Sequence, residues 1–170
     1  MGVGLQALLP NSSRTPLRPC VVCYVTRAKP AEGGERSAEG RDDLELLVFT
    51  GHPWGGVQVV AGGIDAGETA LEAARRELLE ESGLRLEDGV YLGRHDYFVR
   101  LEGLQAHEAR YGYHFHVSHE LPDAWVHTVS SGEADQGLEY RFYWVGVSEA
   151  KLDWELGEFL PLLEEREARD

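Results

Sequence analysis

The segment from Thr69 to Gly83 constrains the fold most strongly, because its sequence marks both ends of one helix. Thr69, followed three residues later by Glu72, forms a capping box, which is typical of a helix N-terminus. Glycine at position 83 is typical of the residue just after a helix C-terminus. Between these ends a narrow stripe recurs at helical spacing and consists of Leu71, Ala74, Leu78 and Ser82. We therefore expect one helix with a narrow buried face.

Segments with β-strand character lie on both sides of this helix. We expect strands at Cys20–Arg27, Leu44–Thr50, Val57–Ala61, Gly89–His95, Tyr97–Leu101, Tyr111–Ser118 and Tyr140–Val147. An amphipathic helix is expected over residues 149–167, where the apolar positions are Leu152, Leu156, Phe159, Leu160 and Leu163. The order strands, helix, strands, helix favours an α/β sandwich with a mixed sheet.

The length of the chain indicates one domain. It has 170 residues, of which 42% are hydrophobic, and this is enough for a substantial core. Residues 1–18 mix Gly, Pro, Ser and Arg without periodicity and predict an irregular N-terminal arm, which leaves residues 19–170 for the domain. Residues 29–43 are rich in Gly, Glu and Arg and predict a long loop.

The only two cysteines, Cys20 and Cys23, are expected to be ordinary buried residues. Three residues along a strand span about 10 Å, and residues at odd offsets point to opposite faces of the sheet. A disulfide between these cysteines is therefore sterically excluded if the segment is a strand.

Three carboxylates crowd one side of the predicted helix. At about 100° per residue, Glu80 lies about 60° to one side of Glu77, and Glu81 lies about 40° to the other. Their mutual repulsion is tolerable on a solvated acidic face, or a bound divalent cation can relieve it. Hard cations such as Mg²⁺ favour oxygen ligands of this kind. From the helix alone, both alternatives stay open.

The residues upstream of the helix add a second constraint. Residues 62–84 match the pattern G-x5-E-x7-R-E-U-x-E-E-x-G-U, in which U is a bulky aliphatic residue. The matching residues are Gly62, Glu68, Arg76, Glu77, Leu78, Glu80, Glu81, Gly83 and Leu84. This is the Nudix box, so the chain resembles a Nudix hydrolase, and the resemblance implies an α/β/α sandwich. The subfamily is not identified.

The resemblance also implies roles for individual residues. Glu77, Glu80 and Glu81 match the glutamates that hold Mg²⁺ or Mn²⁺, and Glu77 is either a ligand or a hydrogen-bond partner of a metal-bound water. The backbone carbonyl of Ala61 is a further metal-ligand candidate. Glu68 matches the loop glutamate that pairs with the arginine at position 76 and braces the loop against the helix. Gly62 and Gly63 are expected to let the backbone pass close to the site, and Gly83 is expected to end the helix.

The reaction implied by the resemblance is hydrolysis of a diphosphate linkage in a nucleoside diphosphate joined to another group. Metal ions would neutralise the phosphate oxygens and activate a water, and a carboxylate would accept its proton. The family does not place this base consistently. Besides the box glutamates, the downstream candidates are Glu133, Asp135 and Glu139, which lie just before the expected strand Tyr140–Val147, and of these we select Glu139. The alternative for each is a solvated loop charge. The alternative is a non-catalytic Nudix-fold module that senses nucleotides.

The net charge bounds the partners of the protein. With 16 Lys or Arg and 30 Asp or Glu, the formal charge is -14, which disfavours nucleic acid polymers and anionic membrane surfaces. A small phosphorylated nucleotide remains compatible, provided that a metal ion lies between it and the carboxylates. The segment Met1–Pro10 lacks the features of a secretory signal, and no apolar run reaches about 18 residues, so a cytoplasmic location is expected. A homodimer stays open.

Some residues outside the box are candidates for substrate contacts. Trp54 lies in an expected turn and offers either a stacking surface or a core cap. His114 and His116 project from one strand face and are expected to be exposed strand residues rather than a second metal site. The candidates for phosphate contact, which the sequence does not rank, are Arg27, Arg94, Arg100 and Arg141.

Overall fold

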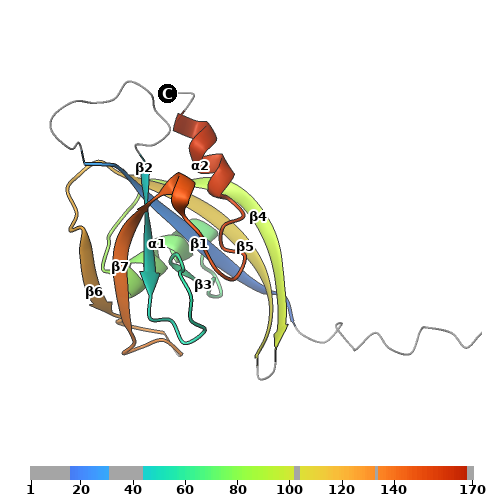
Figure 1. Ribbon diagram of the computed structural model, residues 1–170. Helices are drawn as coiled ribbons and strands as arrows, with labels where there is room; N and C mark the ends of the chain where they lie inside the picture. The colour runs from blue at the N-terminus through green and yellow to red at the C-terminus, as the bar shows by residue number, and fades with distance from the viewer. Residues whose placement is uncertain (1–15, 31–43, 102–103, 133, 168–170) are drawn as a thin grey trace, which may run out of the picture.

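A computed structural model of the protein describes residues 16–30, 44–101, 104–132 and 134–167. These residues form a seven-stranded sheet in the order β4-β5-β1-β2-β7-β6, with β3 paired to part of β1 (Figure 1). The strands are β1 (Arg18–Ala28), β2 (Leu44–Thr50), β3 (Ala61–Gly63), β4 (Gly89–Leu101), β5 (Leu104–Val117), β6 (Ala124–Thr128) and β7 (Glu139–Gly146). β1 and β5 are parallel, whereas the other pairs are antiparallel. The mixed sheet predicted from the sequence is therefore confirmed.

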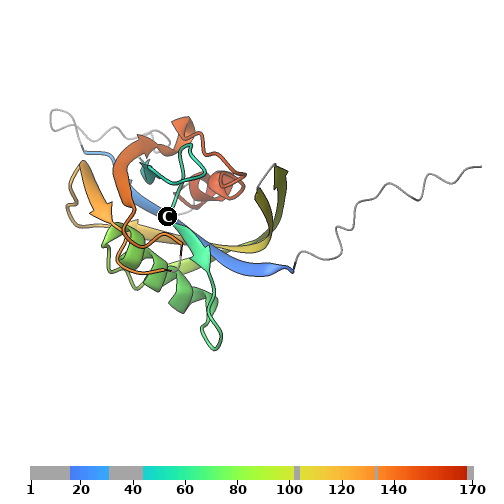
Figure 2. The ribbon, with the colours of Figure 1, turned by 90° about the horizontal axis from the view of Figure 1, so that it is seen from below.

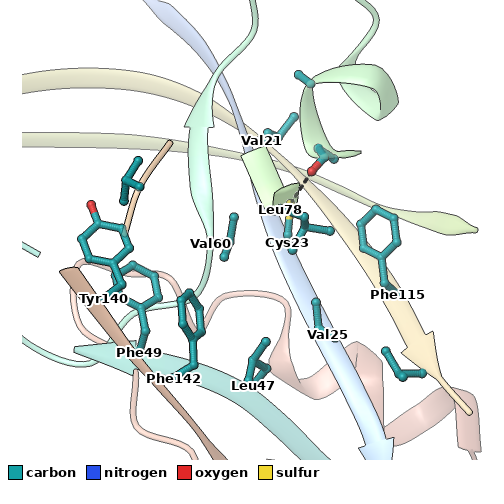
Figure 3. Close-up of a cluster of buried hydrophobic side chains, with 14 residues drawn as sticks. Val21, Cys23, Val25, Leu47, Phe49, Val60, Leu78, Phe115, Tyr140 and Phe142 are labelled. Atoms are coloured by element: carbon teal, nitrogen blue, oxygen red, sulfur yellow. Dashed lines mark hydrogen bonds between the residues drawn. The ribbon is translucent and has the colours of Figure 1, made fainter. Parts of the chain in front are cut away.

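β1 is buried on both faces and separates two hydrophobic cores. Val21, Cys23 and Val25 pack in one core, to which helix α1 (Ala70–Ser82) contributes its buried face (Figure 3). The alternate residues Val22 and Tyr24 pack in the other core. The near-continuous apolar sequence of β1 follows from this double burial.

The second core is closed by the C-terminal part of the chain. A short 3₁₀ helix, η2 (Val147–Glu149), is followed by turns and by helix α2 (Leu160–Glu167). This segment places Leu156, Phe159 and Leu163 against the core. Figure 2 shows α1 and α2 on opposite sides of the sheet, which is the arrangement of an α/β/α sandwich.

Several element boundaries differ from the predicted ones. β4 is one strand across the two predicted segments, although its register shifts between Tyr91 and Gly93. β6 was not predicted. The predicted strand at Val57–Ala61 is reduced to an isolated bridge between Phe49 and Gln58, and β3 follows at Ala61.

The C-terminal helix is shorter than the predicted range of 149–167. Trp154 and Glu155 have φ angles of 60° and 56°, which are incompatible with a right-handed helix. Pro161 also has no N–H group, so it is tolerated in the first turn of α2 but disfavours a helix that continues through it. The helix therefore begins at Leu160.

The ends and the long loop of the chain lie mostly outside the described residues. Residues 1–15 of the predicted arm and 31–43 of the predicted loop belong to this group. Arg18, the last residue of the predicted arm, already belongs to β1. The domain boundaries remain predictions. Among the described residues, no helix is long and apolar enough to span a membrane.

Both cysteines are buried and free, which confirms the expectation from the strand pattern. Cys23 points toward α1, and its thiol donates to the carbonyl oxygen of Ala74 at 3.7 Å (Figure 3). Burial raises the pKa of Cys20 to about 12, so this thiol stays protonated at neutral pH.

Candidate active site

The N-terminus of α1 is fixed by the capping box that the sequence predicts. The Glu72 amide donates to Thr69 Oγ1 at 3.2 Å, and the Thr69 amide donates to Glu72 Oε2 at 2.8 Å. At the other end, Gly83 has a φ angle of 78°, and its amide donates to the Leu79 carbonyl oxygen. α1 thus begins and ends as predicted, which fixes the angular positions of its three glutamates.

Arg76 connects the helix to the preceding loop. Its guanidinium donates from Nε to Glu68 Oε1 at 2.7 Å and from Nη2 to Glu68 Oε2 at 2.9 Å. Nη2 also donates to the carbonyl oxygen of Gly63 at 2.9 Å. The hydrogen bonds from Arg76 lower the pKa of Glu68 below its usual value, so this carboxylate stays ionised. The pair therefore holds the loop, β3 and α1 together.

Glu77 lies directly against the backbone of β3. A Cβ atom added to Gly62 would lie only 2.1 Å from the carboxylate carbon of Glu77, so the two residues meet without space between them. Burial raises the pKa of Glu77 to about 7, and Arg76, whose Nη1 donates to Glu77 Oε1 at 2.8 Å, opposes this shift only in part. Gly62 is thus required by the close approach of a carboxylate.

Glu81 is the most deeply buried of the three glutamates, with 4% of its surface exposed. Burial is the largest cause that raises its pKa well above the usual value, and the charges of Glu77 and Asp135 act in the same direction. Its Oε2 atom is buried without a hydrogen-bond partner. Such an atom costs free energy unless a proton or a cation occupies its lone pairs.

The backbone of β3 presents carbonyl groups to the same region. Val60 and Ile64 bond to β1, through Cys23 N–H to Val60 O at 2.8 Å and Ile64 N–H to Pro19 O at 3.0 Å. Because the hydrogen bonds of an antiparallel ladder alternate, Ala61 and Gly63 turn their backbone groups away from β1. The carbonyl of Gly63 reaches Arg76 in this way. The carbonyl of Ala61 points away from β1 for the same reason.

These residues line a cleft of about 990 Å³. Its acidic wall consists of Asp65, Glu77, Glu80, Glu81, Glu108 and Asp135, and its cationic residues are Arg18, Arg76 and Arg110. Aromatic residues from distant segments complete the lining: Phe49, His52, Trp54 and Trp154. The cleft is therefore large enough, and varied enough in chemistry, for a small polar ligand with an aromatic group.

The three box glutamates do not form a ready metal cluster. Within the described residues, no three His, Cys, Asp or Glu side chains group closely enough to hold a metal ion. Nη1 of Arg76 lies 2.8 Å from Glu77 Oε1 and 3.3 Å from Glu80 Oε2 and thus occupies both carboxylates. The donor chemistry nevertheless fits a hard divalent cation, because all three side chains supply oxygen atoms and Glu81 Oε2 is buried without a partner.

The structure distinguishes two of the three downstream acids. Asp135 lines the cleft, and its charge contributes to the raised pKa of Glu81. Glu139 is exposed at the start of β7 and does not line the cleft. Glu133 lies outside the described residues. Of the two described candidates, Asp135 is therefore the one that the fold brings to the box glutamates.

The arginines suggested as phosphate contacts lie elsewhere. Arg27 pairs with Glu45 and Asp123, Arg94 pairs with Asp96, and neither lines the cleft. Arg100 and Arg141 are also absent from the cleft lining. In the part of the chain that the structure describes, the arginines that line the cleft outside the box are Arg18 and Arg110, which were not predicted because they lie in strands without a motif.

The histidines of β5 are explained by their neighbour on β1. Thr26 Oγ1 lies 2.7 Å from His114 Nε2 and 3.2 Å from His116 Nδ1. His116 is exposed and His114 half-buried. This pairing needs no metal ion, and neither histidine lines the cleft.

The fold and the box together define a class of protein, and sequence comparison agrees with it. The model of the NUDIX domain matches residues 36–163, which is most of the chain. The protein belongs to the Nudix family, as the box predicts. Over 73 residues it is 44% identical to an RNA pyrophosphohydrolase of Rhizobium meliloti. The match covers 41% of this chain and 39% of the relative, so it spans well under half of that protein.

Solved structures share the fold at low sequence identity. The superposition on a MutT protein from Methanosarcina mazei has a TM-score of 0.59 at 15% identity and covers 92% of this chain and 99% of that chain. The superposition on the NUDIX domain of Shewanella oneidensis NrtR, solved with ADP-ribose, has a TM-score of 0.60 at 13% identity and covers 94% of each chain. The superposition on a mutT/nudix family protein from Listeria innocua has a TM-score of 0.59 at 18% identity and covers 90% of this chain and 95% of that chain. These similarities confirm the predicted Nudix fold.

Proposed function

We propose that the protein is a Nudix-type pyrophosphohydrolase that depends on Mg²⁺ or Mn²⁺ and cleaves a diphosphate linkage in a nucleotide. Nudix proteins generally use divalent metal ions, in agreement with this proposal. The observation that carries it is the buried, unpartnered Oε2 atom of Glu81, which lies in a cleft with the carboxylates of Glu77 and Glu80. An oxygen atom in this position is suited to a cation.

The proposal assigns separate roles to the residues of the cleft. Glu77, Glu80 and Glu81, together with the carbonyl oxygen of Ala61, would hold the cation. A bound cation neutralises phosphate oxygens and makes a coordinated water more acidic. Arg76 holds α1 against the preceding loop and β3 through its hydrogen bonds to Glu68 and to the carbonyl oxygen of Gly63. The proton acceptor would be a box glutamate or a downstream acid, and Asp135 is better placed for this role than Glu139.

The test is a substrate screen with a matched variant. Nucleoside di- and triphosphates, nucleotide sugars, ADP-ribose and dinucleoside polyphosphates are incubated with Mg²⁺ or Mn²⁺, and released phosphate or nucleotide is measured. We expect turnover of at least one compound and a loss of at least about 100-fold in kcat for Glu81→Gln, the order expected from loss of a group that stabilises the transition state. If no compound is cleaved, or if Glu81→Gln keeps the wild-type rate, the catalytic proposal fails.

The alternative is a nucleotide-sensing module without catalysis. Calorimetric titration with Mg²⁺ and nucleotides separates the two, because a sensor binds these ligands without turnover. The complete set of box carboxylates in the cleft favours the enzyme, since a sensor has no need to keep all of them.

An RNA 5′ end is a second candidate substrate, because the partial relative is an RNA pyrophosphohydrolase. The net charge of -14 argues against extended contacts with a polymer, although it leaves the terminal phosphates of an RNA compatible with the cleft. A 5′-triphosphorylated oligonucleotide therefore belongs in the screen. Its failure alone would leave the small-nucleotide proposal standing.

A further inference from the structure

The lining of the cleft includes two tryptophans on different segments. Trp54 belongs to the turn between β2 and β3, and Trp154 belongs to the turn that follows η2. Their ring centroids lie 5.2 Å apart with an interplanar angle of 56°, and both residues are half-buried and line the cleft. Each ring therefore keeps part of its surface open to the cleft.

Trp54 is not explained by core packing. Of the four tryptophans, Trp125 and Trp144 pack against one core and Trp154 packs against the other, whereas Trp54 belongs to neither cluster among the described residues. The ring of His52 lies edge-on to Trp54 with centroids 5.5 Å apart, and this histidine also lines the cleft. The position of Trp54 thus gives the cleft an aromatic surface without adding to either core.

The backbone of Trp154 has an unfavourable conformation that its neighbours stabilise. Its φ angle of 60° is in the left-handed region, which is costly for residues other than glycine, and Glu155 shares this conformation. Nη1 of the buried Arg110 donates to the Trp154 carbonyl oxygen at 2.5 Å, and the Trp154 indole N–H donates to Gly55 O at 3.1 Å. Surrounding contacts therefore fix the indole beside the turn that carries Trp54.

The two turns are joined as one unit. The Val57 amide donates to Asp153 Oδ2 at 2.8 Å, and the Asp153 amide donates to the Val57 carbonyl oxygen at 3.0 Å. Gly56 leaves room for this contact, because an added Cβ would lie 2.5 Å from the same carboxylate. The aromatic pair is thus presented by a connected scaffold, which lowers the entropic cost of binding a ligand.

The segment that follows Trp54 connects the tryptophan pair to β3, which lies beside the box glutamates. Gln58, Val59 and Ala61 all line the cleft, and the three steps from Gln58 to Ala61 cover about 10 Å of extended backbone. A ligand with an aromatic ring at one end and a diphosphate at the other matches this arrangement. A nucleoside diphosphate derivative has that form.

We propose that Trp54 and Trp154 form the stacking site for the nucleobase of the substrate. This inference deepens the proposed function and rests on it for the identity of the ligand. The two rings would contact the faces of the base, and Gly55 O beside them already accepts from Trp154 Nε1 and Gln58 Nε2. Stacking of this kind tolerates every base. The site therefore selects nucleotides over simple diphosphates and discriminates weakly between adenine and guanine.

The test compares two diphosphonates that cannot be hydrolysed at the bridge. One is α,β-methylene-ADP and the other is methylenediphosphonate, which has the same diphosphonate without a nucleoside. Affinities are measured calorimetrically with Mg²⁺, by competition where binding is weak. Base stacking on an aromatic side chain is worth about 1–3 kcal/mol, so we expect Trp54→Ala and Trp154→Ala each to weaken binding of the nucleotide analogue by about 5- to 150-fold. Binding of methylenediphosphonate should stay unchanged.

Trp144→Ala is the matched control. Trp144 is also half-buried, and its indole N–H also donates to a backbone carbonyl oxygen, that of Pro122 at 3.0 Å, but it does not line the cleft. This variant should bind both diphosphonates like the wild type. Since Trp154 also packs against a core, Trp154→Phe and thermal unfolding of every variant distinguish lost stacking from lost structure. The phenylalanine variant should recover most of the nucleotide affinity.

The outcomes separate this inference from the proposed hydrolysis. If the wild type binds α,β-methylene-ADP no better than methylenediphosphonate, or if folded Trp54→Ala binds both like the wild type, the stacking site is overturned whether or not the protein is an enzyme. If the tryptophan variants bind both diphosphonates more weakly by the same factor, the proposed stacking site is overturned as well. Binding that depends on the tryptophans without cleavage of any substrate would support the site and refute the hydrolase.

Discussion

At the scale of single residues, the contact between Gly62 and Glu77 limits what the site can tolerate. The φ angle of Gly62 is not in the left-handed region, so the glycine is required by space and not by backbone conformation. The Glu77 carboxylate is buried and also bonded to Arg76, so it cannot move aside freely. A methyl group at position 62 must therefore displace a carboxylate that we propose as a metal ligand.

The first prediction follows from this contact. Gly62→Ala should lower kcat/KM at fixed Mg²⁺ by at least about tenfold, because an enforced displacement of a proposed ligand disturbs the cation site. Gly146→Ala is the control, since its added Cβ would make only an ordinary contact, 3.5 Å from Glu149 Oε2, and this glycine does not line the cleft. Steady-state kinetics over a range of Mg²⁺ concentrations would check this. Equal activity of Gly62→Ala and the wild type would refute the requirement for space.

Burial of two acids at the site makes the stability of the metal-free protein sensitive to pH. The pKa of Glu77 is raised to about 7, and that of Glu81 is raised well above its usual value. A carboxyl with a raised pKa binds protons more tightly in the folded than in the unfolded protein. Its contribution to stability is therefore fully present below the unfolded pKa and is lost as the pH rises through the folded one.

The second prediction concerns this pH dependence. In EDTA, Glu81→Gln should be more stable than the wild type at pH 8, with a smaller loss of stability between pH 5 and pH 8, because the amide cannot ionise. For Glu77, the shift from 4.5 to about 7 corresponds to a cost of at most about 3 kcal/mol when the group is ionised. Urea unfolding at each pH would measure this. Glu87→Gln changes an exposed residue and should lose as much stability between pH 5 and pH 8 as the wild type. An equal loss of stability for Glu81→Gln and the wild type would contradict the explanation.

At the scale of elements, α1 was predictable because its signals are local. A capping box at Thr69 and a glycine at position 83 depend only on neighbouring residues, so the sequence contains all that is needed to place both ends. The angular positions of Glu77, Glu80 and Glu81 follow from helix geometry. The pairing of Glu68 with Arg76 was expected through the family resemblance and has the bidentate form that guanidinium and carboxylate favour.

β6 was not predictable because its contacts are with a helix that is distant in the sequence. It supplies donors to the C-terminal carbonyl groups of α1: Trp125 Nε1 lies 3.0 Å from Ser82 O, and His127 Nε2 lies 3.0 Å from Glu80 O. The next segment adds the Ser130 amide, also to Glu80 O. Carbonyl groups at a helix end need such partners, but nothing in the local sequence shows which segment provides them.

The residues of the site outside the box were missed for the same reason. Arg18 and Arg110 lie on the neighbouring parallel strands β1 and β5, and Trp154 lies in a turn where a helix was predicted. Only the pairing of distant strands brings these residues to the box. Asp135 and Glu139 were both candidates, and the loop geometry that places Asp135 in the cleft has no local sequence signal. Pro161 was the one local signal for the late start of α2.

At the scale of the whole molecule, the cleft is acidic like the rest of the chain but has arginines among its carboxylates. Among the described residues, three arginines line the cleft, Arg18, Arg76 and Arg110, although the whole chain has an excess of 14 negative charges. Arg76 and Arg110 are paired with carboxylates, whereas Arg18 forms no ion pair with a side chain among the described residues. Positive charge is thus available within the cleft for a few phosphates, while an acidic exterior repels the remainder of a long polyanion.

The third prediction is that nucleic acid polymers bind weakly, even if a terminal phosphate enters the cleft. A basic protein that binds RNA without sequence preference gains affinity by releasing counterions along the strand, but an acidic surface offers no such gain. Fluorescence anisotropy with a single-stranded 20-nucleotide RNA in about 0.15 M salt should give a Kd weaker than about 10⁻⁴ M, the weak end of ordinary non-specific binding. Adding a 5′-triphosphate should improve affinity by an amount that does not grow with RNA length, because only the terminal groups reach the cleft. Micromolar binding that strengthens with length and weakens steeply with salt would show that a polymer contacts the surface, and would make an RNA end the better substrate proposal.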